Sequence, residues 1–408
     1  MTRLLLFTNE YPYRTGDAVF VEKEIGALAE SFDDVVVFCH ARDTSAGMGK
    51  LPAGVRYGGN LFQPAPEDAP RRLIELPAIG LFLAAAWREL WSGRLLRHPK
   101  YFVLASKVGI TQAHRTAVRE AIAGAEDVVA YGFWAMGGGL GVPWLRGVRA
   151  RTVRVHRYDL YEANAPSGYL PFRPFMFARV DRILAISQDA ADYLHRHHPE
   201  TRGKVALSRL GAHGPKDQPR VRERRPVRTI VSCSAVSEVK RVERIHDAVT
   251  ALPGLDADHP VRWVHFGDGP LMPQLRAACA NLPPGLEIEL HGQVPNETVT
   301  EFYATEGADL FVNLSSSEGV PVSIMEAIAH GIPVLATAVG GTPEIVGHAQ
   351  RTGELVEAES PVEEVAKSMR DMLDAPARSY APRELWESDY DARRTAHLAA
   401  DLVRSAGR

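Results

Sequence analysis

The chain has 408 residues, of which 45% are hydrophobic and 24% are charged, and its formal net charge is −3. A single hydrophobic core rarely serves a chain of this length, so we expect two domains of roughly 200 residues each. The absence of a domain-wide excess of Lys and Arg argues against a nucleic-acid-binding protein. The three cysteines, Cys39, Cys233 and Cys279, lie far apart and lack metal-ligand spacing. This pattern argues against a disulfide framework and a zinc site, and it favours a reducing, cytoplasmic setting.

The N-terminus predicts a buried strand rather than a targeting segment. The apolar run in MTRLLLFTNEYPY is short and ends without a small-residue cleavage site. The longest apolar stretch, AIGLFLAAAW, is well short of the ~20 residues that a membrane-spanning helix needs. We therefore expect no transmembrane segment and, at most, peripheral contact with the inner face of the cell membrane.

In the first half of the chain, strand patterns alternate with helix patterns. Runs rich in Val, Ile and Leu predict strands, and apolar residues at helical spacing predict the helices between them. The strands are expected at 4–8, 35–39, 128–132, 153–156 and 182–187, and the helices at 18–30 and 189–195. This alternation predicts a parallel doubly wound sheet that binds ligands at the carboxyl ends of its strands. We assign residues 1–212 to this first Rossmann-like domain.

An insert at about residues 70–120 interrupts this alternation and predicts helices only. Between Pro70 and Arg119, nine basic residues stand against two acids, and Trp87 and Trp91 lie among the arginines. One interpretation is a helical hairpin whose arginines form a solvated face. The other is a basic amphipathic surface that lies on an anionic membrane.

The second half of the chain repeats the α/β pattern. Residues 213–228 are rich in proline and charge and predict an interdomain linker. Residues 229–378 then predict a second Rossmann-like domain, of the type that binds nucleotides. Its strands are expected at 229–233, 262–266, 287–290 and 310–314, and its helices at 242–251, 271–282 and 297–306. The strongly helical end, 379–408, is expected to pack back on the first domain.

The stretch SSSEGVPVSIMEAIAHGIPV, which follows the strand expected at 310–314, predicts a loop and then a helix. Pro321 suits the first helical turn, and Gly331 stops the helix. Free backbone N–H groups at the start of such a helix favour an anion such as a diphosphate. These groups are expected to be those of Gly319, Val320, Val322 and Ser323.

Two acids, Glu318 and Glu326, flank this helix start. One interpretation is hydroxyl binding, in which Glu326 accepts hydrogen bonds from a ribose and Glu318 from a hexose. A second is a glycosidase pair, which the spacing alone does not exclude. A third is two exposed acids, since acids near helix N-termini are favoured in any case.

The same stretch closely resembles the C-terminal signature of family 4 retaining glycosyltransferases of the GT-B fold. It has a Glu, seven residues, a second Glu, a helix, Gly-x-Pro-Val and a Gly-Gly loop. The similarity extends through HFGDGPL, HGQVPNETVTEFY and ADLFVNLS, and it reaches RVHRYDLYEAN and RILAISQDAADYL in the first half. The resemblance covers most of the chain, with the helical insert least distinctive, and it includes exopolysaccharide-type enzymes. It implies two Rossmann-like domains with a cleft between them.

The resemblance also implies roles for matched residues of the second domain. Glu326 would bind the donor ribose, Glu318 the donor sugar, and Lys240 the departing diphosphate, as a point charge. The family usually has an arginine five residues before this lysine, whereas this chain has Ala235. Arg241 could take the place of this arginine. The alternative is that Arg241 is a solvated charge where the chain enters a helix.

In the first domain, His156 matches the family's active-site histidine, so the expected catalytic residues are His156, Lys240 and Glu318. Further donor contacts are expected at glycine loops, a strand end and a helix start, namely Gly16, Ser234, Gly267, Gln293, Val294, Gly319, Val320, Pro321, Val322 and Ser323. Acceptor contacts are expected from Tyr158, Asp159 and Tyr161. Because no Asp-x-Asp motif lies beside a phosphate loop, we expect no metal and no other cofactor.

These features predict a retaining, metal-independent hexosyltransferase that uses a UDP- or GDP-linked sugar. The acceptor is expected to be a saccharide or lipid-linked saccharide of cell-surface polysaccharide synthesis, reached at an anionic membrane surface. Three alternatives stay open: a soluble transferase acting on a small natural product, a GT-B epimerase or phosphorylase, and a non-catalytic nucleotide-sugar binder.

Overall fold

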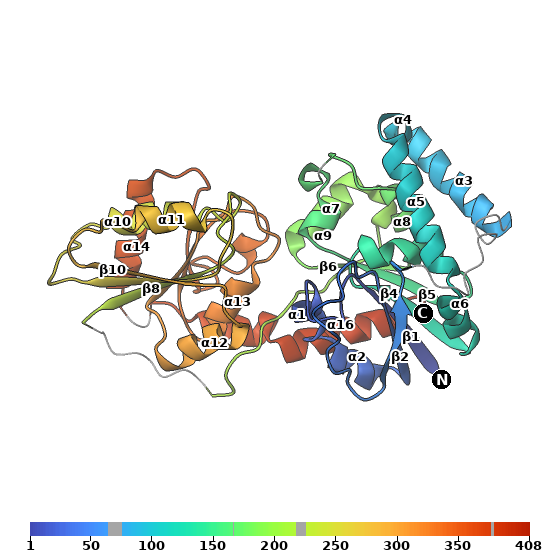
Figure 1. The fold of residues 1–408 in the computed structure, drawn as a ribbon, viewed down its shortest axis with the longest axis horizontal. Coiled ribbons are helices and arrows are strands. Elements are labelled where there is room, and N and C mark those ends of the chain that lie inside the picture. Colours follow the sequence, from blue (N-terminus) through green and yellow to red (C-terminus); the bar gives the residue numbers. More distant parts are fainter. Residues whose placement is uncertain (64–75, 166, 218–225, 377–378) are drawn as a thin grey trace. The chain divides into compact units, whose positions relative to one another are not determined.

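The computed structural model describes residues 1–63, 76–165, 167–217, 226–376 and 379–408 (Figure 1). It divides into two compact units, of which unit 1 holds Met1–Leu210 with Arg393–Arg408 and unit 2 holds Gly211–Ala392. Unit 1 thus ends at residue 210 rather than 212, and residues 379–392 stay with unit 2. Residues 70–75 of the expected insert and 218–225 of the expected linker lie outside the described residues.

Unit 1 is built on a parallel sheet with the strand order β3-β2-β1-β4-β5-β6-β7. Its strands are β1 (Thr2–Thr8), β2 (Asp34–Cys39), β3 (Val55–Asn60), β4 (Asp127–Gly132), β5 (Ala150–Val155), β6 (Arg182–Ala185) and β7 (Val205–Leu207). All five expected strands are present, and β3 and β7 are additions at the two edges. The order reverses between β1 and β4, and ligands of doubly wound sheets bind outside the carboxyl ends at this point.

Helices cover both faces of this sheet. They are α1 (Ala18–Val21), α2 (Ile25–Ser31), α3 (Leu76–Trp91), α4 (Arg94–Arg97), α5 (Pro99–His114), α6 (Thr116–Ala123), α7 (Arg157–Leu160), α8 (Arg173–Arg179), α9 (Gln188–His197) and α16 (Ala392–Ser405), with short 3-10 turns at Gly137–Trp144, Glu162–Asn164 and Pro199–Thr201. Leu5 and Val36 belong to a core that includes residues of α5 and α8. Leu4 and Val35 belong to the core on the other face, which includes residues of α1, α2 and α16. Consecutive buried residues on both faces are typical of strands in parallel sheets.

The helix expected at 18–30 is wrong in one respect, because the structure divides it into α1 and α2. Tight turns at residues 22–24 separate the two, and Glu24 leaves the helical pattern as the residue before α2. The Glu24 carboxylate pairs with Arg154 at 2.6 Å inside the core. Tertiary pairing of a buried acid therefore overrides the helical pattern.

Unit 2 contains a second parallel sheet, with the order β10-β9-β8-β11-β12-β13. Its strands are β8 (Arg228–Cys233), β9 (Val261–Phe266), β10 (Leu286–Gly292), β11 (Leu310–Asn313), β12 (Val334–Thr337) and β13 (Gly353–Val356). Its helices are α10 (Val242–Thr250), α11 (Met272–Ala278), α12 (Asn296–Thr305), α13 (Val322–Ala329), α14 (Val362–Asp374) and α15 (Pro382–Leu385), with a 3-10 turn at Thr342–Glu344 and a π-helical turn at Trp386–Tyr390. Helices α10, α11 and α14 cover one face of the sheet, whereas α12 and α13 lie on the other (Figure 1). The order reverses between β8 and β11.

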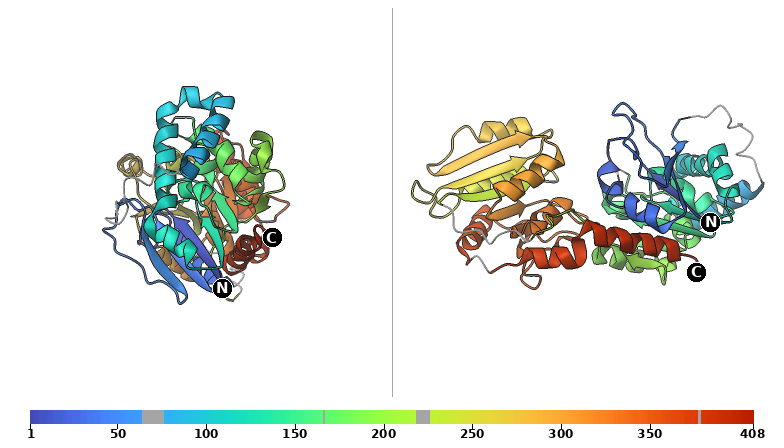
Figure 2. Two further views of the ribbon diagram at one scale, coloured as in Figure 1. Left: turned by 90° about the vertical axis from the view of Figure 1, so that its right-hand side faces the viewer. Right: turned by 90° about the horizontal axis from the view of Figure 1, so that it is seen from below.

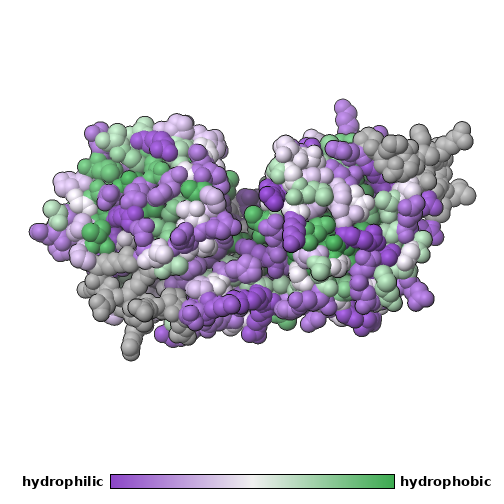
Figure 3. Space-filling model, turned by 60° about the horizontal axis from the view of Figure 1, so that its bottom comes forward, coloured by the Kyte–Doolittle hydropathy of each residue, from purple (hydrophilic) through white to green (hydrophobic). Residues whose placement is uncertain are grey.

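The C-terminal helix α16 returns to unit 1. The ribbon views place it beside the other elements of unit 1 (Figures 1 and 2). Ala396, Ala400 and Val403 are buried in the same core as residues of α1 and α2. Hydrophilic side chains predominate on the face of the molecule shown in Figure 3. Among the described helices, none combines the length and the apolar character needed to cross a bilayer.

Candidate functional site

The loop after β11 and the start of α13 form a cluster of backbone donors in unit 2. Pro321 is the residue before the helix, with φ −73° and ψ 114°, so α13 begins at Val322 rather than at the proline. Gly331, with φ +73°, follows the helix end. In the described structure, the N–H groups of Gly319, Val320, Val322 and Ser323 donate to no protein acceptor. This arrangement leaves four donors for an anion at a helix start.

The glycine pair Gly340-Gly341 packs against the backbone of this loop. The Gly341 N–H donates to the carbonyl oxygen of Gly319 at 2.7 Å. At Gly340, which has φ +53°, an added Cβ would lie 2.0 Å from the carbonyl oxygen of Glu318. Only glycine allows this approach, and the sequence Gly340-Gly341 therefore fixes the position of the Glu318–Gly319 backbone.

The expected lysine and the first expected glutamate meet directly. Lys240, in the loop between β8 and α10, donates from Nζ to Oε1 of Glu318 at 2.6 Å. The Glu318 side chain is 7% exposed, and the Lys240 side chain is 29% exposed. Asn313, at the end of β11, donates from Nδ2 to the same oxygen at 3.3 Å. The site thus presents a fixed carboxylate and a partly accessible ammonium group.

The second glutamate is buried on α13. Glu326 is 6% exposed, and Asn296, the first residue of α12, donates from Nδ2 to its Oε1 at 3.1 Å. The interpretation of Glu318 and Glu326 as two solvated acids is therefore wrong. Burial of two carboxylates in one region of a protein is costly and needs partners, which the structure supplies.

Arg241, the open substitute for the arginine that is absent at Ala235, donates to protein acceptors in two loops. Its backbone has φ +47°, and its Nε donates to the carbonyl oxygen of Leu314 at 2.9 Å. Its two terminal nitrogens reach the carbonyl oxygen of Ala358 and the carboxylate of Glu359, at 2.8 and 2.9 Å. The guanidinium group is thus used to brace two loops. The interpretation of Arg241 as a solvated charge is also wrong, since its side chain is only 11% exposed.

The other expected donor contacts of unit 2 surround the ends of β8, β9 and β10. Ser234 follows β8 and donates its N–H to the carbonyl oxygen of Phe266 at 3.0 Å. A Cβ on Gly267, which has φ +136°, would lie 1.9 Å from the carbonyl oxygen of Ser234. Close packing of two strand ends is therefore reason enough for this glycine. Gln293 is exposed and Val294 half-buried, directly after β10.

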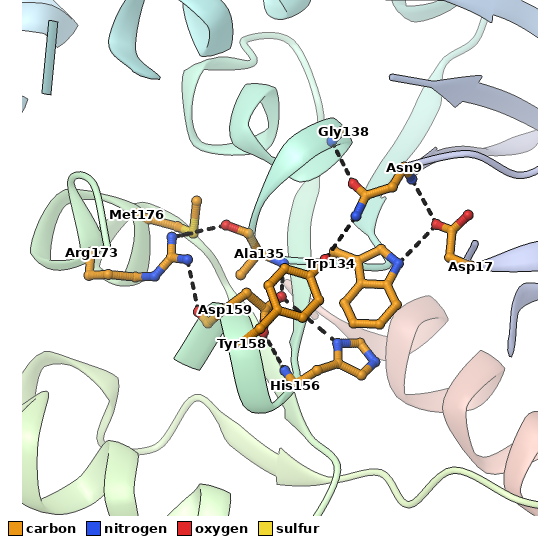
Figure 4. A network of polar contacts seen from close by, with 10 residues as sticks. All are labelled: Asn9, Asp17, Trp134, Ala135, Gly138, His156, Tyr158, Asp159, Arg173 and Met176. Carbon is orange, nitrogen blue, oxygen red and sulfur yellow. Dashed lines mark hydrogen bonds and ion pairs between the residues drawn. The ribbon is translucent and has the colours of Figure 1, made fainter. Parts of the chain in front are cut away.

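In unit 1, His156 follows β5 and precedes α7 (Figure 4). The residue is 5% exposed, and neither ring nitrogen has a hydrogen-bond partner among the described residues. Burial lowers the pKa of His156, and this effect outweighs the opposing influence of Asp159, whose carboxylate lies 3.9 Å from Nδ1. At neutral pH the imidazole is therefore neutral, with one N–H donor and one acceptor nitrogen available to a ligand.

The three expected acceptor residues occupy different environments. Asp159 is fully buried, and its oxygens accept the N–H groups of Ala135 and His156 at 2.7 and 2.5 Å. This position contradicts a direct acceptor contact and makes Asp159 a support for the His156 turn. The Tyr161 hydroxyl donates to Asp189 at the start of α9. Tyr158 is 42% exposed and is the most accessible of the three.

The loop after β1 lies beside this histidine. Asn9 donates from Nδ2 to the Tyr158 hydroxyl at 2.8 Å and accepts the N–H of Gly138 at 3.0 Å. Gly16 is exposed with φ +53°, and a Cβ there would lie 1.6 Å from the Glu10 carboxylate. Gly16 was expected here from the sequence, whereas Asn9 was not. The feature of the sequence that could have indicated Asn9 is its position directly after the first strand, next to the point where the strand order reverses.

Three comparisons with known proteins bear on this arrangement. The family model described as glycosyl transferases group 1 matches residues 216–385, which include all the expected donor residues of unit 2. Residues 216–385 are therefore similar to the group 1 glycosyl transferases.

Curated relatives are similar to part of this chain. This chain is 29% identical over 280 residues to D-inositol 3-phosphate glycosyltransferase of Streptomyces avermitilis. The matched region covers 62% of this chain and 59% of that protein. The chain is 28% identical over 217 residues to the amylovoran biosynthesis glycosyltransferase AmsK of Erwinia amylovora, covering 50% and 51%. The chain thus spans about half the length of the curated relatives that it matches.

Solved structures match this chain over almost its whole length. WaaG, a glycosyltransferase of lipopolysaccharide biosynthesis, aligns with a TM-score of 0.61 and 15% identity over 99% of this chain and 100% of its own. The Anabaena protein HepE in complex with UDP aligns with a TM-score of 0.63 and 16% identity, over 99% and 100%. These likenesses confirm the predicted GT-B fold with its two parallel sheets.

Proposed function

We propose that this protein transfers a hexose from a UDP- or GDP-linked sugar to a hydroxyl acceptor with retention of anomeric configuration. The observation that carries the proposal is the junction of Lys240 and Glu318 at 2.6 Å, in the loop that presents free N–H groups at the start of α13. A cation and backbone donors suit a diphosphate, and a fixed carboxylate suits sugar hydroxyls. The HepE structure, which contains UDP, supports a nucleotide donor.

The residues of unit 2 would act on the leaving diphosphate by electrostatics. Lys240 and the N–H groups would stabilise its growing charge, an arrangement that needs no metal. The acceptor oxygen would form its bond to the anomeric carbon on the face from which the diphosphate departs. The acceptor proton would pass to the departing phosphate oxygen. Glu318, which already accepts hydrogen bonds from Lys240 and Asn313, is better suited to bind hydroxyls than to donate a proton.

His156 would contribute from unit 1 as a neutral hydrogen-bonding group. Its ring nitrogens make no short hydrogen bond within the described structure, where the Asp159 carboxylate lies 3.9 Å from Nδ1, and such buried groups cost free energy unless a ligand meets them. A sugar hydroxyl, which both donates and accepts, matches a neutral imidazole. We assign acceptor binding to unit 1 and donor binding to unit 2.

The test is donor binding. Glu326→Ala should weaken nucleotide-sugar binding by about 10-fold or more, because a buried carboxylate that accepts ribose hydroxyls is lost. His156→Ala should leave donor affinity within a few-fold of wild type and lower kcat. Calorimetry with UDP-, GDP- and dTDP-sugars measures the first effect, and product formation measures the second. Glu287→Ala, an exposed acid of the same unit, is the matched control.

Failure of wild-type protein to bind any of these sugars would overturn the proposal. Epimer formation from donor alone would instead favour an epimerase of the same fold.

For the acceptor we propose a lipid-linked saccharide of cell-surface polysaccharide synthesis, reached at an anionic membrane. The surface of α3, α4 and α5 supports this step. Nine of the 17 exposed large hydrophobic residues of the described structure lie on it, namely Ile79, Leu83, Trp87, Leu90, Trp91, Leu96, Tyr101, Val103 and Leu104. We refer to these nine residues as the insert surface. Apolar residues exposed together in this way mark an interaction site.

The charges around the insert surface favour an anionic partner. Arg88, Arg97, Lys100 and Lys107 are exposed there, and Glu89, the one acid between residues 76 and 114, is buried. Each basic residue near an anionic membrane surface contributes about 1 kcal/mol to binding.

Polar and aromatic contacts attach the helices that carry the insert surface to the rest of unit 1. Glu89 accepts a hydrogen bond from the Tyr169 hydroxyl at 2.8 Å, and Tyr169 stacks on His98 at 4.6 Å. Arg94 pairs with Glu162 at 3.0 Å. The exposed residues are therefore presented on a fixed scaffold, which suits binding to a membrane surface.

Vesicle co-sedimentation tests this part of the proposal. Wild-type protein should bind vesicles that contain phosphatidylglycerol, more weakly at high salt because charge is screened. Trp87→Ser combined with Trp91→Ser should lower vesicle binding at least ~10-fold, since each tryptophan removes a large apolar contact. Leu398→Ser, which changes an exposed leucine of α16, should leave binding unchanged.

Equal binding of the double variant and wild type would contradict a membrane role for the insert surface. A shift from dimer to monomer in the double variant, without vesicle binding by wild type, would assign the surface to self-association.

A further inference from the structure

Trp134 lies at the centre of the aromatic contacts around His156. It is the second residue after β4, and 7% of its surface is exposed. Its ring lies 3.7 Å from the His156 ring between centroids, at 36°, and 5.0 Å from the Tyr158 ring (Figure 4). Trp134 therefore covers the imidazole of His156.

The indole N–H of Trp134 is held by Asp17. It donates to Oδ2 at 2.9 Å, and the same carboxylate accepts the N–H groups of Asn9, Glu10 and Tyr11 at 2.7, 2.8 and 2.7 Å. Asp17 is 4% exposed and precedes α1. Its carboxylate thus folds the loop after β1 and also fixes the orientation of one tryptophan.

The network joins segments that follow three different strands. The loop of residues 9–17 follows β1, Trp134 follows β4, and His156 follows β5 (Figure 4). A tryptophan that only filled the core would require apolar contacts alone. Here the ring bridges an anchored carboxylate and an imidazole, so that a change at either end is transmitted to the other.

We infer that Trp134 and Asp17 are positioning residues that hold His156 and the loop of residues 9–17 in one fixed arrangement. This inference rests on the proposed role of His156 in sugar transfer. The groups that face the imidazole are Asp159 on α7, Arg154 on β5 and Glu24 before α2, and Trp134 shields it from water.

Three variants separate this role from simple packing. Trp134→Leu removes the ring and admits water to the imidazole. Trp134→Phe keeps a ring over His156 but loses the bond to Asp17. Asp17→Asn keeps the volume of the side chain and removes its charge. This variant tests the same inference if a Trp134 variant does not fold. Trp144→Phe is the matched control, because Trp144 is a core tryptophan that is 1% exposed and whose indole nitrogen has no partner among the described residues.

Nuclear magnetic resonance titration of His156 in the full chain gives a readout that does not depend on activity. In Trp134→Leu the pKa of His156 should rise toward the ordinary value of about 6.5, because the burial that lowers it is relieved. The Trp144→Phe variant should titrate like wild type.

Kinetics should separate orientation from binding. Trp134→Leu and Asp17→Asn should lower kcat roughly 10- to 100-fold with donor KM nearly unchanged, because the reacting groups lose their alignment. Trp134→Phe should recover part of the loss.

An unchanged His156 titration in Trp134→Leu, or an equal loss of kcat in Trp144→Phe, would overturn the inference. If the protein binds no nucleotide sugar, the proposed function fails, whereas the titration still decides whether Trp134 controls His156.

Discussion

Replacing Lys240 with alanine is expected to lower kcat by about 10²–10³-fold, or about 3–4 kcal/mol of transition-state stabilisation. The Lys240 side chain is 29% exposed and contacts Glu318. Both residues lie at the helix start that would receive the diphosphate. No second cation is available there in the described structure, because Ala235 replaces the usual arginine and Arg241 is bonded to loop carbonyl oxygens. A single lysine would therefore carry the charge that an arginine and a lysine usually share.

Steady-state kinetics with the donor identified by calorimetry measures this loss. Lys240→Arg should not restore full activity, because a planar guanidinium group does not replace a compact ammonium group. Lys367→Ala is the control, since its pair with Asp371 is exposed and contributes little. A Lys240→Ala variant whose kcat stays within three-fold of wild type would refute the assignment.

Replacing Arg154 with leucine should destabilise unit 1 by about 3–5 kcal/mol, because the buried Glu24 carboxylate loses its partner. Arg154 is fully buried on β5, pairs with Glu24 at 2.6 Å and donates to Ser208 at 2.9 Å. Burial acts to lower the pKa of Arg154, but Glu24 and Tyr131 outweigh it and raise the pKa. Arg154 thus stays charged, and its pair with Glu24 links the sheet to the residue before α2.

Urea unfolding of the full chain, followed by hydrogen exchange at β5 and α2, reports the loss in unit 1 separately from unit 2. Arg56→Ala is the control, because its pair with Asp34 at 3.1 Å involves an arginine that is 50% exposed. That change should cost less than about 1 kcal/mol. Adding Glu24→Leu to Arg154→Leu should recover part of the stability. A double variant less stable than the sum of the single changes would contradict the pairing account.

The candidate site shows how far residue patterns lead. The strand before Glu318 and the glycine-proline signals around α13 are local, so the sequence alone predicted the helix start to within one residue. The resemblance identified Glu318 and Lys240, which are 78 positions apart. Their direct contact was not predicted, because it depends on β8 and β11 being neighbours at the reversal in strand order.

Local sequence patterns did not predict the roles of residues whose contact partners are distant in sequence. Asp159 was expected at the acceptor, but its carboxylate is used by the backbone of Ala135 and His156. Arg241 was left between two roles, and the structure gives it a third, as a brace between loops. Trp134 carried no motif at all.

Periodicity and turn residues thus determine the α/β class and most strands, and the family signature indicates which residues to expect at a donor site, because these patterns depend on near neighbours in the chain. The pairing of Lys240 with Glu318, the burial of Glu326 and the stacking of Trp134 on His156 arise only when strands distant in sequence are placed side by side. Side-chain partners and burial are set by that packing, and no local pattern contains it.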